Sequence, residues 1–131
     1  MTHPSKSRIA AMRAARLVAP RQFTIDSVPM PQPAAAEVRI RVQGCGLCGS
    51  NLAVWRGQPW TEYPLQPGAP GHEGWGIVDD VGAGVRSVQR GQRVAFLSEH
   101  GFAEYDLAKA TELVALPAGA DVFPGEALGC A

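Results

Sequence analysis

Apolar and polar residues alternate along most of the chain, a pattern typical of half-buried β-strands. The clearest alternation covers residues 37–43, where Val38, Ile40 and Val42 fall on one face of the predicted strand. Weaker alternation predicts further strands at 13–18, 23–28, 76–81, 93–97, 102–107 and 112–116. Short strands at spacings of roughly 8–12 residues are typical of a barrel or a sandwich, so we expect a mainly β fold.

One short helix is expected between these strands. It covers residues 51–55, with Ser50 as its N-cap and Gly57 after its last turn. A loop rich in proline and glycine follows over residues 59–71. Residues 124–131 have the pattern of the first turn of a second helix.

The composition is that of a single globular domain. A chain of 131 residues fits one domain, given about 100–200 residues per domain. Its hydrophobic fraction of 46% and charged fraction of 18% are far from the signature of disorder. The 15 glycines and 11 prolines would interrupt helices repeatedly and argue against an all-helical bundle. Basic and acidic residues balance at 12 each, so the chain lacks the excess of basic residues expected of a protein that binds nucleic acid.

The N-terminal segment is basic. Residues 1–21 hold five basic residues and no acidic one. Their longest apolar stretch, 9–12, is shorter than the apolar part of a secretory signal, and no later stretch reaches the ~20 residues of a membrane span. We interpret residues 1–11 as a basic flexible tail, with an organelle transit peptide as the alternative, and residues 12–131 as one domain. The odd number of cysteines, three, favours a reducing compartment, so we expect a cytoplasmic protein without a membrane partner.

Two cysteines and one histidine are the candidate chemical groups. Cys45 and Cys48 form a Cys-x-x-Cys pair, which fits half of a four-thiolate zinc site or a redox pair. Cys130 stands alone, however, and no βαβ context is predicted for a redox motif. His72 lies between glycines in Gly71-His72-Glu73-Gly74, which lets the backbone approach a neighbour closely. Singly, such residues are more often structural, but together thiolate, imidazole and carboxylate are the donors of a catalytic zinc site.

From about Met12 to Ala131 the chain resembles the N-terminal, GroES-like catalytic domain of the medium-chain zinc-dependent alcohol dehydrogenase family. Four motifs carry the resemblance, and their order and spacing agree with the family. They are Gly46-Leu47-Cys48-Gly49-Ser50-Asn51 for G-[IV]-C-G-[ST]-D, Gly71-His72-Glu73-Gly74-Trp75-Gly76 for G-H-E-x-x-G, Val81-Gly82-Ala83-Gly84-Val85 for V-G-x-G-V, and Gly91-Gln92-Arg93-Val94 for G-D-R-V. The resemblance implies a mainly β, GroES-like, partly open β-barrel with short helices.

The resemblance also implies a set of metal ligands. Cys48 and His72 would bind the catalytic zinc, and Glu73 would be the nearby carboxylate that can exchange with water on the metal. Glu126 falls where the third protein ligand lies. Its segment Glu126-Ala127-Leu128 is similar to the E-P-L of the polyol-dehydrogenase-like branch, whereas simple alcohol dehydrogenases have a cysteine there.

Further positions match catalytic roles of the family. Ser50 matches the hydroxyl that takes the proton of the alcohol, and Trp55 and, more loosely, Trp60 match aromatic walls of the substrate pocket. Asn51 stands where the family has an Asp that orients the histidine ligand, and Ala53 replaces a relay histidine of some members. The resemblance thus implies that zinc polarises a small alcohol or carbonyl substrate for hydride transfer to or from NAD(P).

Members of the family continue into a dinucleotide-binding half, which we do not expect within this chain. Gly82-Ala83-Gly84 leads to Ser87 in place of a third glycine, precedes a strand instead of a helix and leaves fewer than 50 residues. We therefore expect NAD(P) to need a second domain and this chain alone to be inactive. The alternative function is a stand-alone, non-catalytic barrel module for binding or interaction, and a third interpretation is a co-chaperonin-like ring subunit. The sequence leaves open whether the protein forms a homo-oligomer.

Overall fold

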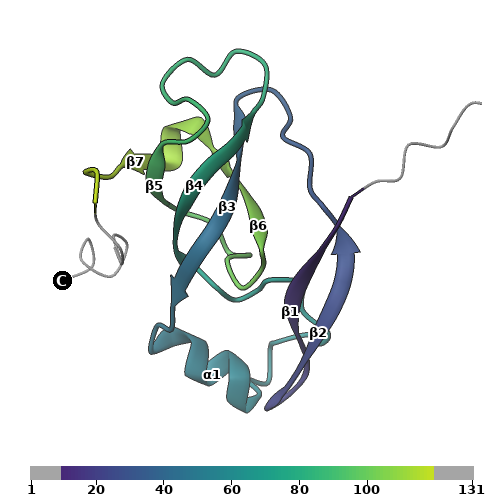
Figure 1. Cartoon of the computed structure of the whole chain (residues 1–131). Coiled ribbons are helices and arrows are strands. Elements are labelled where there is room, and N and C mark those ends of the chain that lie inside the picture. Colours follow the sequence, from purple (N-terminus) through teal and green to yellow (C-terminus); the bar gives the residue numbers. More distant parts are fainter. Residues whose placement is uncertain (1–9, 120–131) are drawn as a thin grey trace, which may run out of the picture.

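The computed structural model describes residues 10–119, which form mainly β-strands (Figure 1). The strands are β1 Ala11–Ala19, β2 Gln22–Pro29, β3 Glu37–Gly46, β4 Glu73–Val81, β5 Arg93–Phe96, β6 Tyr105–Lys109 and β7 Leu113–Ala115. The helices are α1, Ser50–Arg56, and a short 3-10 helix, η1, Ala110–Glu112. The mainly β class predicted from the alternation is therefore confirmed. No helix within residues 10–119 is long and apolar enough to cross a membrane.

The strands form two sheets that do not close into a barrel. β1 and β2 make an antiparallel hairpin, while the other five strands are ordered β6-β3-β4-β5-β7 with antiparallel neighbours. A single bridge between Ala14 and Ala103 connects the hairpin to the loop before β6. The Ala15 N–H donates to the Phe102 carbonyl at 2.8 Å beside this bridge. The expected barrel is therefore open: the hairpin of β1 and β2 reaches the larger sheet through the contacts of β1 with the loop before β6.

The hydrophobic core is formed mainly by side chains of the larger sheet. Val38 and Ile40 of β3 are fully buried, as the alternation over 37–43 predicts, and Val42 packs at the edge of the same cluster. The remaining buried members are Val78, Val88, Val94, Phe96 and Ala108. β3 and β4 are joined by backbone pairing and by this core, and one end of the pair carries the candidate site.

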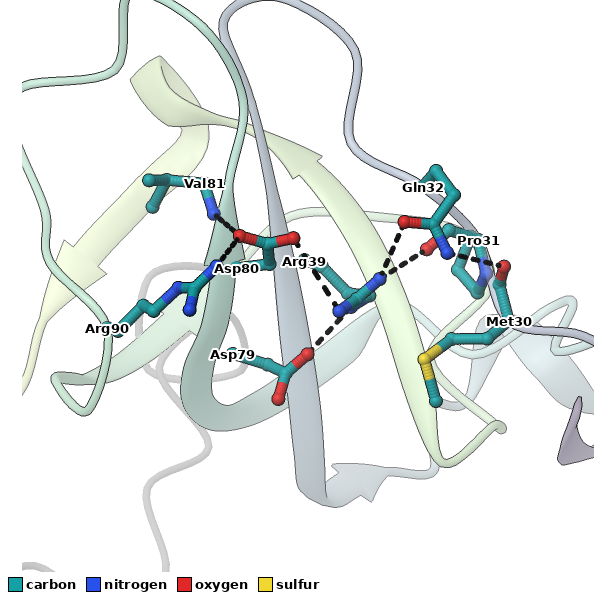
Figure 2. A network of polar contacts seen from close by, with 8 residues as sticks. All are labelled: Met30, Pro31, Gln32, Arg39, Asp79, Asp80, Val81 and Arg90. Carbon is teal, nitrogen blue, oxygen red and sulfur yellow. Dashed lines mark hydrogen bonds and ion pairs between the residues drawn. The ribbon is translucent and has the colours of Figure 1, made fainter. Parts of the chain in front are cut away.

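A polar network joins β3 to β4 and to the segment before β3 (Figure 2). Arg39 donates from Nε to Asp79 Oδ2 at 2.7 Å and from Nη1 to the Pro31 carbonyl at 3.2 Å. Its Nη2 lies 3.7 Å from Asp80 Oδ2, and Arg90 pairs with the other carboxylate oxygen of Asp80. The hydrogen bond from Arg90, together with the charge of Arg39, holds the pKa of Asp80 below its usual value. One guanidinium thereby connects three segments that are separate in sequence.

Several strand boundaries differ from the sequence-based prediction, and the starts of β6 and β4 each differ by three residues. β6 begins at Tyr105, not at residue 102, because Phe102 and Ala103 pair with β1 instead. β4 begins at Glu73, before the predicted range 76–81. Glycines have no side chain to alternate, and Gly74 is needed here because a Cβ on it would lie 2.4 Å from the ring of Phe96.

Candidate metal centre

The antiparallel pairing of β3 with β4 brings two distant loops together. Gly46, the last residue of β3, pairs with Glu73, the first residue of β4. Cys48 follows β3 in the loop before α1, and His72 directly precedes β4. The two motifs recognised in the sequence therefore meet at one end of the larger sheet, where Figure 1 shows α1 leaving β3.

Cys48, His72 and Glu73 form a cluster of potential metal ligands. Sγ of Cys48, a ring nitrogen of His72 and a carboxylate oxygen of Glu73 all lie within 4.8 Å of one another. Glu73 is buried, and the other two side chains are half-buried. Zinc binds these three donor types at about 2.0–2.3 Å, so small adjustments of the side chains would complete a shared coordination sphere. The residues present therefore fit a zinc ion.

Hydrogen bonds favour the thiolate form of Cys48. Bonds from the hydroxyl and the backbone N–H of Ser50, and from His72, hold the pKa of Cys48 below its ordinary value, although the charge of Glu73 acts in the opposite direction. The thiolate is the form that binds metal. Burial instead raises the pKa of Cys45 to about 11, so Cys45 stays a thiol at neutral pH. The Cys-x-x-Cys pair thus divides into one candidate ligand and one half-buried thiol outside the cluster.

The backbone carbonyl of Pro70 orients His72. Nδ1 of the imidazole lies 3.1 Å from this oxygen. In the metal-bound state, where zinc would replace the hydrogen bond between His72 and Cys48, a neutral ring that donates from Nδ1 to this carbonyl has its lone pair on Nε2. A backbone carbonyl is a common partner for the second nitrogen of a metal-binding histidine. We therefore take Nε2 as the ligand atom.

Asn51 links the loops that carry Cys48 and His72. Its Oδ1 accepts from the Cys48 N–H at 3.1 Å, and its Nδ2 donates to the Pro70 carbonyl at 3.0 Å. The same carbonyl also holds His72, so Asn51 acts on the imidazole through Pro70. An ionised aspartate could accept the first hydrogen bond but could not donate the second. Asn51 is therefore suited to its place as a buried positioning residue.

Gly46 makes room for the carboxylate of Glu73. A Cβ at Gly46 would lie 2.1 Å from Oε2 of Glu73. Sequence reasoning did not single out Gly46 as a site residue. Its position at the start of the Gly-Leu-Cys-Gly motif is the sequence feature that could have indicated it. Which side chain fills the space beside Gly46, however, depends on the pairing of β3 with β4.

Ser50 contacts the sulfur of Cys48 instead of capping α1. The N-cap position belongs to Gly49, and no side-chain capping hydrogen bond is present, so the predicted Ser50 cap is wrong. The hydroxyl is directed to Cys48, which competes with a bond to the first turn of the helix. Ser50 also lines a hollow of about 550 Å³, called here the serine hollow, whose other lining residues are His72, Leu97, Ser98, Glu99 and Glu112.

The two tryptophans expected at the substrate pocket lie in different surroundings. Trp55 lines a separate apolar hollow of about 270 Å³ that also contains Cys48. The guanidinium of Arg21 lies 5.4 Å from the centre of its ring. Trp60 is 77% exposed and lines neither hollow. Glu126, like the helix predicted at its segment, lies outside the described residues.

The glycines of Gly44-Cys45-Gly46-Leu47-Cys48-Gly49 have the G-x-G-x-x-G spacing of dinucleotide sites, between a strand and a helix. In such sites the glycines keep the backbone open for a pyrophosphate. Here a Cβ at Gly44 would lie 2.1 Å from the ring of Trp75, and Gly46 faces Glu73. β3 also belongs to an antiparallel sheet. Gly44 and Gly46 therefore serve the packing of β4 side chains against β3.

The sequence also matches a known protein family over most of its described length. Residues 34–119 match the alcohol dehydrogenase GroES-like domain. The chain therefore belongs to this family. Its relatives are medium-chain alcohol dehydrogenases, as the four sequence motifs implied.

Two curated relatives show how much of a longer protein the chain covers. Starvation-sensing protein RspB of Escherichia coli (strain K12) is 40% identical over 85 residues, which are 64% of this chain and 24% of that protein. Sorbitol dehydrogenase of Ovis aries is 36% identical over 76 residues, which are 58% of this chain and 22% of that protein. The chain thus matches about a quarter of the length of these relatives.

Solved structures confirm the GroES-like fold. The crystal structure of RspB from E. coli CFT073 with NADH superposes with a TM-score of 0.74 at 28% identity, covering 86% of this chain and 40% of that chain. A cobalt- and zinc-bound thermostable alcohol dehydrogenase from Pyrobaculum aerophilum superposes with a TM-score of 0.72 at 25% identity. The superposition covers 83% of this chain and 42% of that chain. Zinc and a nicotinamide cofactor are therefore present in structures of relatives.

Proposed function

We propose that this chain is the zinc-binding catalytic domain of an alcohol- or polyol-type dehydrogenase, which prepares an alcohol or carbonyl for hydride transfer to or from NAD(P) held by a second domain. The observation that carries the proposal is the convergence of Cys48, His72 and Glu73, whose ligand atoms lie within 4.8 Å of one another. Membership of the family and the zinc in a relative support it.

Each residue of the site has a separate task in this proposal. A zinc ion bound there would act as a Lewis acid toward the oxygen of the substrate. Cys48 binds as a thiolate, His72 through Nε2 and Glu73 through a carboxylate oxygen, and Glu126 is the proposed further ligand. Ser50 lines the serine hollow beside His72, where its hydroxyl can accept the proton of an alcohol and pass it on.

Zinc analysis of the chain purified without chelator tests the metal centre. We expect about one equivalent in the wild type and a large loss in Cys48→Ser and in His72→Ala, because each removes one donor. Cys45→Ser is the matched control, since this half-buried thiol is outside the cluster and its replacement should leave the zinc content unchanged. Full zinc content in Cys48→Ser and His72→Ala would contradict the proposal.

Activity tests the second half of the proposal. Joined to a dinucleotide-binding domain, the chain should act as a dehydrogenase, and Ser50→Ala should lower turnover by about 10²–10⁴-fold, as expected for loss of an acid–base group. A joined protein that binds zinc and NADH but turns over no alcohol would instead support the stand-alone binding module.

A further inference from the structure

Two carboxylates make the serine hollow acidic. Among its lining residues within 10–119, none is lysine or arginine, and Glu99 and Glu112 are carboxylates. The hollow also offers apolar surface, so its charge, and not a lack of apolar contacts, distinguishes it. The chemistry of its wall therefore bears on which alcohol would bind beside Ser50 and His72.

Strand pairing brings the two glutamates to this hollow from adjacent segments. Phe96 of β5 pairs with Gly74 on one side and with Leu113 on the other. The residues after β5 therefore run between the His72 segment and η1. The Leu97 N–H donates to the Glu112 carbonyl at 3.1 Å, which holds these two segments together. Glu99 thus lies in the loop after β5 and Glu112 in η1, and both are exposed side chains that line the hollow.

Among the described residues, no neighbour neutralises either carboxylate. Within residues 10–119 the side chains of Glu99 and Glu112 have no hydrogen-bond or ion-pair partner. The hydroxyl of Ser98, by contrast, is already bound to Asp106 and accepts from the His100 N–H at 3.0 Å. The two glutamates are therefore the side chains of the hollow that can pair with a charged ligand.

The metal centre does not cancel this charge. The two positive charges of a zinc ion would be balanced by the Cys48 thiolate and the Glu73 carboxylate, a neutral His72 adds none, and the proposed ligand Glu126 would add a further negative charge. Glu99 and Glu112 would then give the hollow two negative charges that the metal does not balance. Such a cleft attracts cations and repels anions.

We propose that the serine hollow selects a small alcohol that carries a positive charge, an amino alcohol, with Glu99 and Glu112 as specificity-determining residues. The inference rests on the proposed function, since it places the hydroxyl of the ligand toward Ser50 and His72 and its ammonium group toward the two carboxylates. Hydroxy acids are repelled by the same charges, and neutral alcohols lack the attraction.

Choline and 3,3-dimethyl-1-butanol test the proposal because they share one shape and differ in charge. Neither has a nitrogen lone pair that could bind the metal directly. The visible spectrum of the cobalt-substituted full chain reports binding next to the metal. We expect choline to bind at least about fivefold more tightly, the factor given by one pair of charges about 4 Å apart in water-like surroundings. The preference should shrink as salt is raised, because salt screens exposed charges.

Variants identify the residues responsible. The double variant Glu99→Gln, Glu112→Gln should bind both probes equally while keeping its cobalt content. Glu62→Gln is the matched control, since Glu62 is an exposed glutamate outside the hollow and its replacement should keep the preference. Equal binding of the two probes by the wild type, no binding of choline up to about 100 mM, or a preference that survives in the double variant would overturn the inference. Failure of the wild type to take up cobalt would instead contradict the proposed function, and this inference with it.

Discussion

At the scale of single residues, Gly46 determines where the carboxylate of Glu73 can lie. A Cβ at this position would be 2.1 Å from Oε2, so Gly46→Ala must displace the carboxylate from the cluster. We expect the variant to bind zinc about tenfold more weakly or worse, in the range of other losses of residues that support metal ligands. Competition with a chromophoric chelator measures the affinity.

Gly49→Ala provides the matched control for this prediction. Gly49 is also next to Cys48, but a Cβ there would meet nothing within 4 Å, and its φ of −57° suits alanine. Its zinc affinity should stay close to that of the wild type. Similar losses in both variants would show that the loop, and not the carboxylate, responds to the added methyl group.

At the scale of elements, Arg39 joins β3 to β4 and to the segment before β3. Its side chain is only 12% exposed, whereas that of Arg13, which bonds Glu104 between β1 and the loop before β6, is 75% exposed. Arg39→Ala should lower the free energy of unfolding by about 2–3 kcal/mol, because the carboxylate of Asp79 and the Pro31 carbonyl lose a donor away from bulk water. Arg13→Ala should cost less than about 1 kcal/mol.

Urea unfolding of the two variants measures the difference. The ion pairs have similar lengths, 2.7 Å for Arg39 with Asp79 and 2.8 Å for Arg13 with Glu104. The expected difference therefore comes from the lower exposure of Arg39 and from its additional contacts with Pro31 and Asp80. An Arg13→Ala variant that loses as much stability as Arg39→Ala would refute this ranking.

At the scale of the whole molecule, buried Asp106 makes stability depend on pH. Burial raises the pKa of Asp106, although the Ser98 hydroxyl and the Leu107 N–H at 2.7 Å partly stabilise its charge. The folded state therefore binds the proton of Asp106 more tightly than the unfolded state does. The contribution of Asp106 to the free energy of unfolding falls as pH rises above about 4. Relative to Asp106→Asn, the wild type should be more stable at acid pH than at neutral pH.

Urea unfolding of both proteins between pH 4 and pH 7 checks this expectation. Subtracting one curve from the other removes the titration of the remaining groups, which the two proteins share. A difference that stays constant, or that favours the wild type increasingly as pH rises, would mean that Asp106 is not destabilised when it ionises.

Local patterns predicted the strands well because side chains alternate with period two wherever one face is buried. The burial of Val38 and Ile40 follows directly from this rule. The start of β4 was missed because Gly74 and Gly76 contribute nothing to an alternation, and the capping role of Ser50 was wrong because its hydroxyl contacts a sulfur that sequence alone does not place beside it.

The sequence by itself determined the donor types, the motif spacing and the family, because these depend on residue identities along the chain. Tertiary structure decided which donors meet. The register of β3 with β4 places Cys48 beside His72 and Glu73, leaves Cys45 outside the cluster, and makes Gly46 part of the site. It also decided the acidity of the serine hollow, because Glu99 and Glu112 approach His72 only through the pairing of β5 with its two neighbours. Contacts between residues far apart in sequence depend on strand order and register, which hydrophobic alternation within one strand does not encode.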